Sequence, residues 1–340
     1  MIKRLLTLAT HKIYSLPVLV LMPHSSCNCR CVMCDIWKSN NKKKEISAET
    51  LEKHIDVFKK LSVREVVLSG GEALMHSNLW KLCRLLKKNG IRITLLSTGL
   101  LLKKYASEIA EYIDQVIVSV DGSEEVHDKI RNIPKAFARM EEGIRELMKC
   151  KPDFPVTGRC VLQKENYLDF INIVKAAKII GLNQISFLAA DVSSDAFNRP
   201  GGWPSEKINQ IALTETETIE FEKIIESSFA DLAHEYKTNF IAESPAKIKR
   251  LVQYYKAVNH MGDYPETVCN APWVSAVIES DGSVMPCFFH KPYGNIYEKS
   301  FSDIINSRQA TQFRRNLDVT VDDICKRCVC SLKLKPYQMH

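Results

Sequence analysis

The sequence predicts an α/β protein: a partial (β/α)6 TIM-like barrel followed by a small C-terminal Cys-rich α+β module. Between residues 18 and 188, short β-branched runs alternate with longer amphipathic stretches, which is the pattern of consecutive βα units around a parallel sheet. Polar and glycine residues follow four of these runs, and clustered cysteines dominate the chain after residue 265. With 340 residues, of which 45% are hydrophobic, the chain can bury a full core.

Six strands are expected in the barrel, with helices between them. Ser47 is a suitable cap for the first of these helices, and Asn89 followed by Gly90 ends the second. Right-handed crossovers would curl the sheet into an open barrel that binds ligands at the C-terminal strand ends. The expected strands are 18–22, 65–68, 92–96, 115–120, 156–162 and 184–188, and the expected helices are 48–60, 79–89, 103–112, 135–150 and 167–180.

Three domains are expected. Residues 1–190 would form the barrel core, 191–265 a connecting segment and candidate substrate wall, and 266–340 an auxiliary module. Helical patterns in the second and third parts cover 216–236, 245–260 and 302–316. An amphipathic first turn built on Ile2, Leu5, Leu6 and Ala9 could touch a membrane surface, but packing against the domain is the favoured expectation.

Composition narrows the class of protein. The net charge of +7 is modest and most Lys and Arg lie at helical spacings, so solvated helix faces explain them without a nucleic-acid partner. No window reaches the apolar length of a membrane span. The twelve cysteines cluster as ligand groups, which favours a reducing compartment and predicts a cytoplasmic protein.

The first cysteine group follows the first expected strand. Cys27, Cys31 and Cys34 have a three-then-two spacing, one thiolate fewer than a four-iron cluster needs, so one iron would keep an open position. A zinc site or buried core cysteines are the alternatives, but structural zinc prefers four ligands in two close pairs. Cys29 breaks the spacing and is interpreted as a bystander.

Polar residues follow three more expected strands. Residues 69–72 read SGGE, 97–99 read STG and 119–122 read SVDG. Because the ends of parallel strands meet at one edge, these groups should face the mouth that holds the cysteine loop.

A second cysteine group lies near the C-terminus. Cys269, Cys287, Cys325 and Cys328 can close around one metal or one cluster, and Cys330 stands close behind. Spacing alone leaves zinc and an iron–sulfur cluster about equally favoured.

The triplet, the GGE at 70–72 and VSVDG at 118–122 together resemble the radical S-adenosylmethionine (radical SAM) superfamily. The resemblance implies a [4Fe-4S] cluster held by Cys27, Cys31 and Cys34. Its fourth iron would bind the amino and carboxylate groups of S-adenosyl-L-methionine (SAM).

The resemblance also implies SAM contacts at the second strand end. Gly70, Gly71 and Glu72 match the stretch whose backbone carbonyl and carboxylate oxygens receive the methionine ammonium, and glycines let the backbone approach closely. Ala73 stands where the family commonly has proline.

Further SAM contacts are implied at the next strands. Ser119 and Asp121 match ribose-contacting positions, and Thr98 is a candidate at the third strand end, although the Asn often found beside it is missing. Arg159 stands where relatives carry a basic residue for the methionine carboxylate. A buried arginine needs an anion, which a ligand or a protein carboxylate could supply equally.

The C-terminal segment resembles the SPASM/twitch extension of radical SAM proteins, which favours an auxiliary [4Fe-4S] cluster over zinc. One auxiliary cluster is expected, held by Cys269, Cys287, Cys325 and Cys328, with Cys330 as an alternative ligand. Two clusters are therefore expected in all.

His127, Asp128 and Arg131 belong to an HDKIR stretch after the fourth strand. We interpret this stretch as a salt bridge at the start of a helix.

These expectations predict a radical SAM enzyme that reductively cleaves SAM to a 5′-deoxyadenosyl radical and abstracts a hydrogen atom from a substrate. A small molecule such as a sugar, an alcohol or a nucleoside-type metabolite is favoured, because no segment ahead of residue 18 is long enough for a peptide-recognition domain. The alternative is a maturase that modifies a peptide or protein side chain. A reducing partner such as flavodoxin or ferredoxin is implied, and a zinc-stabilised, non-catalytic binding protein is the alternative from another class.

Overall fold

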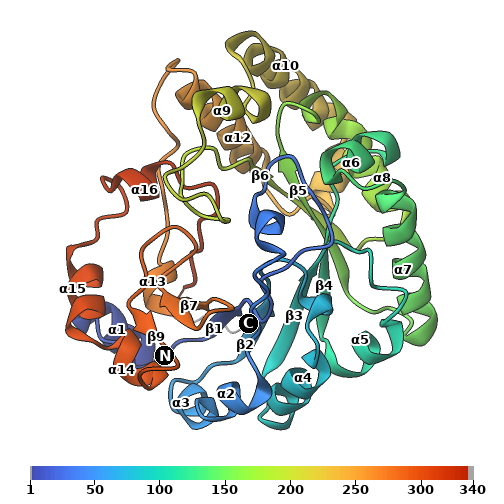
Figure 1. Cartoon of the computed structure of the whole chain (residues 1–340). Helices are drawn as coiled ribbons and strands as arrows, with labels where there is room; N and C mark the ends of the chain where they lie inside the picture. Colours follow the sequence, from blue (N-terminus) through green and yellow to red (C-terminus); the bar gives the residue numbers. More distant parts are fainter. Residues whose placement is uncertain (1, 336–340) are drawn as a thin grey trace.

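The computed structural model describes residues 2–335, and the predicted partial barrel is confirmed (Figure 1). Across these residues one sheet has the order β6-β5-β4-β3-β2-β1-β7-β8-β9. The first six strands are parallel and adjacent in chain order, as right-handed βα units require. The strands are β1 Val18–Leu21, β2 Glu65–Leu68, β3 Arg92–Ser97, β4 Gln115–Ser119, β5 Val156–Leu162, β6 Gln184–Ala189, β7 Ser275–Ile278, β8 Ser283–Met285 and β9 Gly294–Asn295.

Helices cover the outer side of the curved sheet, with α4, α5, α7 and α8 along its barrel part (Figure 1). Their apolar faces pack on strand residues that are also buried, such as Val66, Leu95 and Val118. The helices are α1 Ile2–Thr10, α2 Ala48–Glu52, α3 Ile55–Lys60, α4 Leu79–Lys88, α5 Ala106–Tyr112, α6 Glu124–Arg131, α7 Ala136–Cys150, α8 Phe170–Ile179, α9 Ser205–Ile211, α10 Glu215–Asp231, α11 Ala233–Lys237, α12 Pro245–Val258, α13 Ala271–Val274, α14 Phe301–Ile305, α15 Arg308–Asn316 and α16 Asp323–Lys326.

Several helices that the periodicity joined are divided in the structure. The stretch 48–60 forms α2 and α3, because Lys53 closes the first helix and the buried His54 begins the second. The imidazole Nε2 of His54 lies 3.2 Å from the carbonyl of Ile296, a tertiary contact that periodicity cannot reveal.

The C-terminal module continues the barrel sheet. β7 pairs with β1 in parallel register, with Leu21 opposite Ile278, and β8 and β9 then run antiparallel. The chain therefore returns beside its own first strand, and the residues after β7 lie next to the loop that follows β1.

The first helix differs from the expectation. In α1, Thr7 is buried, whereas Ile2 is 71% exposed and Leu5 is 49% exposed. The expected packing of these apolar side chains is therefore wrong. Within residues 2–335 no helix combines the length and the apolar character that a membrane crossing requires.

Candidate active site at the barrel mouth

The three spaced cysteines lie together between β1 and a 3-10 turn at Ile36–Ser39, in one packed group that includes Leu100. Burial raises the pKa of Cys27 to about 12 and that of Cys34 to about 11, and the neighbouring Cys31 thiol adds to both shifts. No cysteine of residues 2–335 is in a disulfide. Buried thiols that must ionise together need a shared cation, so this donor set fits an iron–sulfur cluster.

Backbone contacts hold the start of this loop against the GGE segment. The amide of Glu72 donates to the carbonyl of Ser26 at 2.9 Å, and a Cβ on Gly71 would lie 2.1 Å from that carbonyl oxygen. The Asn40 side chain accepts from the amide of Cys27 and donates to its carbonyl, both at 2.9 Å. We call residues 22–35, between β1 and the 3-10 turn, the cluster loop. Only glycine fits at position 71 because this loop approaches it so closely, and the contact from Asn40 was not expected from the sequence.

Helix α6 holds the middle of the loop. The amides of Arg30 and Val32 donate to the carbonyls of Arg131 and Ile130 at 3.1 and 3.0 Å. The Arg131 guanidinium also donates to Cys31 Sγ at 3.4 Å. Arg131 is the last residue of α6, so the predicted salt bridge at a helix start is wrong. The reason is tertiary: the end of the helix meets the cysteine loop.

The Glu72 carboxylate is fully buried and joins the second strand end to the third. It accepts from the hydroxyl of Ser97, from the amide and hydroxyl of Thr98, and from the amide of Leu74. Burial raises the pKa of Glu72, and the hydrogen bonds from Thr98 oppose that shift. Both carboxylate oxygens therefore have protein donors. Ammonium binding by Glu72 and ligand binding by Thr98 stay predictions.

The predicted ribose contacts have different surroundings. Asp121 is fully buried and forms an ion pair with Arg131, while Ser119 is half-buried and lies opposite Arg159 in the sheet register. The Arg159 guanidinium donates to Ser186 Oγ at 3.3 Å, and its charge acts on the buried Glu243 carboxyl, whose pKa it helps to lower against the rise caused by burial. A ligand anion and a protein carboxylate both remain possible partners of Arg159. Its role, and those of Ser119 and Asp121, stay predictions.

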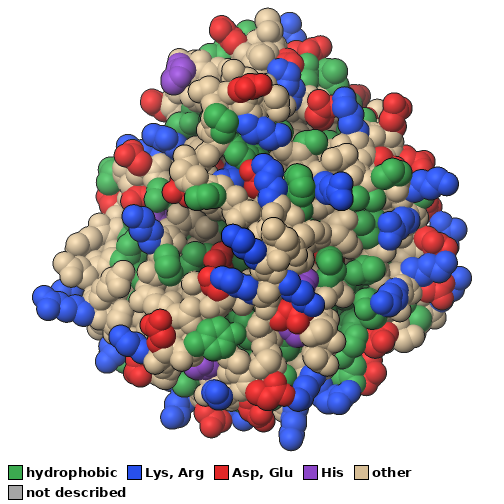
Figure 2. Space-filling view, viewed as in Figure 1, with side chains coloured by type: hydrophobic (Ala, Val, Ile, Leu, Met, Phe, Trp, Pro, Cys, Tyr) green, Lys and Arg blue, Asp and Glu red, His purple; other side chains and the backbone are tan. Residues whose placement is uncertain are grey.

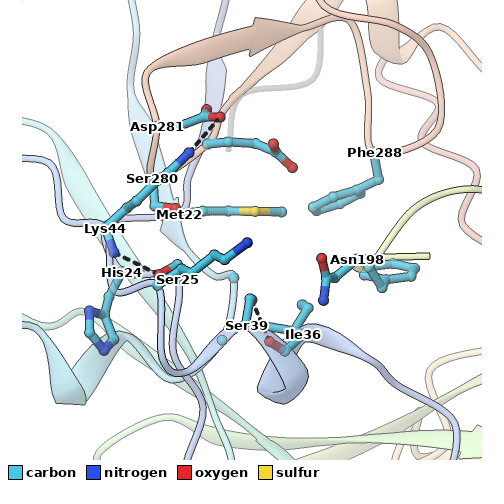
Figure 3. A pocket seen from close by; sticks show the side chains of 15 residues that line it. Met22, His24, Ser25, Ile36, Ser39, Lys44, Asn198, Ser280, Asp281 and Phe288 are labelled. Atoms are coloured by element: carbon cyan, nitrogen blue, oxygen red, sulfur yellow. Dashed lines mark hydrogen bonds and ion pairs between the residues drawn. The ribbon is translucent and has the colours of Figure 1, made fainter. Parts of the chain in front are cut away.

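A cavity of about 300 Å³, the inner cavity, opens beside the cluster loop and is lined by Gly70 and Gly71. Figure 3 shows Met22 and Phe288 pointing toward one another across it, with Asn198 beside them. These residues come from the end of β1, from the C-terminal module and from the connecting segment, so the cavity lies where all three meet.

The segment 191–204 is fastened to the cluster loop at Asp35. The indole Nε1 of Trp203 donates to Asp35 Oδ2 at 2.8 Å, and the side-chain Nδ2 of Asn198 donates to the Asp35 backbone carbonyl at 2.9 Å. Arg199 is 2% exposed, pairs with Asp191 and lies 4.4 Å from the centre of the Trp203 ring. Residues 191–204 are therefore an internally bonded loop, and the wider substrate wall expected at 191–265 stays a prediction.

A second cavity of about 590 Å³, the outer cavity, extends between this loop and the C-terminal module. It shares Phe197, Asn198, Glu279 and Phe288 with the inner cavity. Figure 2 shows a hollow on this face, with charged side chains of both signs around it. The two cavities therefore lie side by side, and the side chains that they share belong to the lining of both.

All five C-terminal cysteines line a third cavity of about 410 Å³, together with Arg159 and inward-facing residues of β1 to β4. Burial raises the pKa of Cys287 to about 11, and Cys269 and Cys330 add to the shift. This set of gathered thiols fits a cluster. The five cysteines are Cys269, Cys287, Cys325, Cys328 and Cys330.

Cys325 and Cys330, two of the candidate ligands of the auxiliary cluster, have different neighbours. Cys325 Sγ lies 3.4 Å from the imidazole Nε2 of His290, which is 3.7 Å from a carboxylate oxygen of Asp322. Burial raises the pKa of Cys330, and Arg159 opposes that shift. The set Cys269, Cys287, Cys325 and Cys328, with Cys330 as an alternative fourth ligand, stays a prediction.

Comparison with known proteins matches both parts of the chain to families. The Radical SAM superfamily matches residues 21–177, and SPASM, an iron-sulfur cluster-binding domain, matches residues 269–329. The antilisterial bacteriocin subtilosin biosynthesis protein AlbA of Bacillus subtilis is 26% identical over 83% of this chain and 57% of its own length. The AdoMet-dependent heme synthase of Methanosarcina barkeri is 30% identical over 46% of each chain. The chain thus spans about half the length of these two relatives.

Solved structures share the fold. Streptococcus suis SuiB bound to S-adenosylmethionine superposes with a TM-score of 0.64 at 15% identity, covering 96% of this chain and 75% of SuiB. The enzyme anSMEcpe with bound AdoMet gives a TM-score of 0.62 at 20% identity, covering 87% and 82%. These similarities extend through the barrel and the C-terminal module.

Proposed function

This chain belongs to the radical SAM superfamily of enzymes and carries a SPASM domain, and from that premise we propose that it is a maturase that modifies a peptide. The observation that carries the proposal is the pair of adjacent cavities, inner and outer, which share aromatic and polar lining residues next to the cluster loop. The match to a bacteriocin biosynthesis protein, which spans both parts of the chain, supports it.

In this proposal Cys27, Cys31 and Cys34 hold the SAM-binding cluster, and the C-terminal cysteines hold the auxiliary one. When bound, the cluster and SAM supply a 5′-deoxyadenosyl radical from one electron, which a flavodoxin or ferredoxin would deliver. The chain's own task is to bind and orient both partners and to exclude water. Gly70 and Gly71 line the inner cavity and offer backbone oxygens to the methionine ammonium.

The side chains that line the inner and outer cavities suit a peptide substrate. Phe197 lies 6.1 Å from both Phe288 and Phe289 by ring centroids, which makes an aromatic surface for an apolar side chain. Lys291 and Asp195 line the outer cavity with opposite charges. An extended chain can use this mixed lining along its length, with one residue reaching the inner cavity.

A small-molecule substrate, which we favoured from the sequence, has weaker support. The relative named for heme synthesis matches only 46% of this chain, whereas the bacteriocin protein matches 83%. The side chains that line the two cavities can contact a peptide without a separate peptide-recognition domain. Membership of an enzyme superfamily also leaves the zinc-stabilised binding protein without support.

The test uses the full chain, reconstituted anaerobically with iron and sulfide and reduced with dithionite in the presence of SAM. A mixture of short random-sequence peptides and a mixture of nucleotides, sugars and porphyrins are supplied separately. We expect the peptide mixture to stimulate 5′-deoxyadenosine formation and a subset of peptides to change mass, both followed by liquid chromatography and mass spectrometry. Stimulation by the small molecules alone would overturn the proposal.

A further inference from the structure

A buried ion pair lies directly behind the cluster loop. The Arg131 guanidinium donates through one nitrogen to Cys31 Sγ at 3.4 Å and through another to the Asp121 carboxylate. The Arg131 side chain is 7% exposed and that of Asp121 is 0% exposed. The guanidinium cation of Arg131 therefore lies between the sulfur of a proposed cluster ligand, Cys31, and the carboxylate of Asp121.

Both charged groups are held in place. Asp121 Oδ1 accepts from the amide of Val161 at 2.9 Å, and the Asp121 carbonyl accepts from the Asn166 side chain at 2.8 Å. Asn132, with φ of 52°, ends α6 in the left-handed region immediately after Arg131. Together with the backbone bonds from α6 to the loop, these contacts fix the distance from the guanidinium to the sulfur.

The charges of Arg131 and Asp121 change how readily a cluster bound through Cys31 accepts an electron. Adding an electron makes a cluster and its thiolates more negative, so a nearby cation favours the reduced form and raises the reduction potential. Low solvent exposure weakens screening and strengthens this effect. The Asp121 carboxylate opposes it from the far side of the guanidinium.

We propose that Arg131 and Asp121 set the reduction potential of the cluster held by Cys27, Cys31 and Cys34, Arg131 raising it and Asp121 lowering it. The inference rests on the proposed cluster site and on no particular substrate. It makes Arg131 a positioning and tuning residue, because it acts through Cys31.

The test is a potentiometric titration of the full chain carrying both clusters, followed by electron paramagnetic resonance without SAM. The relevant cluster is identified as the one whose signal changes when SAM is added afterwards. We expect Arg131→Gln to lower its potential by about 59 mV or more, which is a tenfold change in the ratio of reduced to oxidised cluster for a one-electron couple. Asp121→Asn should shift it in the opposite direction, and Arg131→Lys should keep most of the wild-type value.

Arg139→Gln is the matched control, because Arg139 donates to the carbonyl of Leu100 beside the same loop and to no thiol. The auxiliary cluster is an internal reference whose potential should not move. Shifts of the same sign in Arg131→Gln and Asp121→Asn, or no shift in either, would overturn the inference. If Arg131→Gln fails to hold iron, the sign of the Asp121→Asn shift decides.

Failure of the cluster assignment gives a different result. Wild-type chain that binds no SAM-sensitive cluster contradicts the proposed function itself. A normal wild-type cluster whose potential ignores both substitutions contradicts only the role of Arg131 and Asp121.

Discussion

The two cysteine groups are assembled in opposite ways. Cys27, Cys31 and Cys34 come from one short loop, and Asn40, the GGE segment and the end of α6 bond to that loop from three directions. The C-terminal cysteines come from three separate stretches of chain and line a cavity against the barrel interior. The first group is defined by local spacing and the second by tertiary packing.

This difference separates two tasks. Ser25, near the start of the cluster loop, and Ile36, directly after its end, line the inner cavity, where a ligand would meet this loop. The C-terminal group shares a cavity with inward-facing residues of β1 to β4, and Phe288 lines both this cavity and the inner cavity. Loss of the first cysteine group should abolish cleavage of SAM, whereas loss of the second should affect modification of the peptide.

The largest expected effect comes from Cys31→Ala. The variant should lose about four irons per chain and form no 5′-deoxyadenosine above background, because the SAM-binding cluster loses a ligand. Iron analysis and mass spectrometry measure both. Cys150→Ala is the control and should retain both, since Cys150 is an exposed cysteine at the end of α7 and belongs to neither cysteine group. If Cys31→Ala forms 5′-deoxyadenosine at the wild-type rate, the first cysteine group does not hold the SAM-binding cluster.

Cys287→Ala should also lose about four irons, from the auxiliary cluster. Its 5′-deoxyadenosine formation without peptide should stay within about threefold of wild type, whereas modified peptide should disappear, because the start of the reaction needs only the first cluster. Comparing the iron contents of Cys325→Ala and Cys330→Ala then shows which of these two thiols the auxiliary cluster needs. Equal loss of both activities in Cys287→Ala would show that the two groups are not separable.

Gly71→Ala tests whether the first group depends on its surroundings. The added Cβ would overlap the Ser26 carbonyl, so we expect about 1–3 kcal/mol of destabilisation and about a tenfold loss of 5′-deoxyadenosine formation. Thermal unfolding and product analysis measure these. Gly90→Asn is a suitable control, because Gly90 has open space around it and asparagine tolerates its positive φ. An unaltered Gly71→Ala protein would mean that the loop can shift freely.

The smallest expected effect is that of Trp203→Phe, which removes the hydrogen bond to Asp35 and keeps most of the ring. We expect a loss of about 1 kcal/mol in holding the 191–204 loop, seen as a rise of about fivefold in KM for peptide with little change in kcat. Trp273→Phe removes a similar bond, to His11 Nδ1 at 3.2 Å, away from the mouth. It should leave KM unchanged, and an equal effect of both variants would point to general destabilisation.

Much of the barrel could be predicted because its signals are local. The strands at 65–68 and 156–162 have the predicted bounds, and the other four differ by one residue. Helix breaks such as the one at His54 were missed because they depend on contacts with residues far along the chain. The pairing of β7 with β1 was missed for the same reason.

The cysteine positions and the strand-end polar groups were also readable from the sequence, because ligand spacing and strand ends are local properties. The sequence alone thus determined the fold class, the family resemblance and the triplet Cys27, Cys31 and Cys34. Only the tertiary structure decided that Glu72 bonds to the third strand end, that Asp121 pairs with Arg131, and that Arg131 reaches Cys31. A buried charge takes whichever partner the packed elements bring within reach, and sequence periodicity carries no record of that partner.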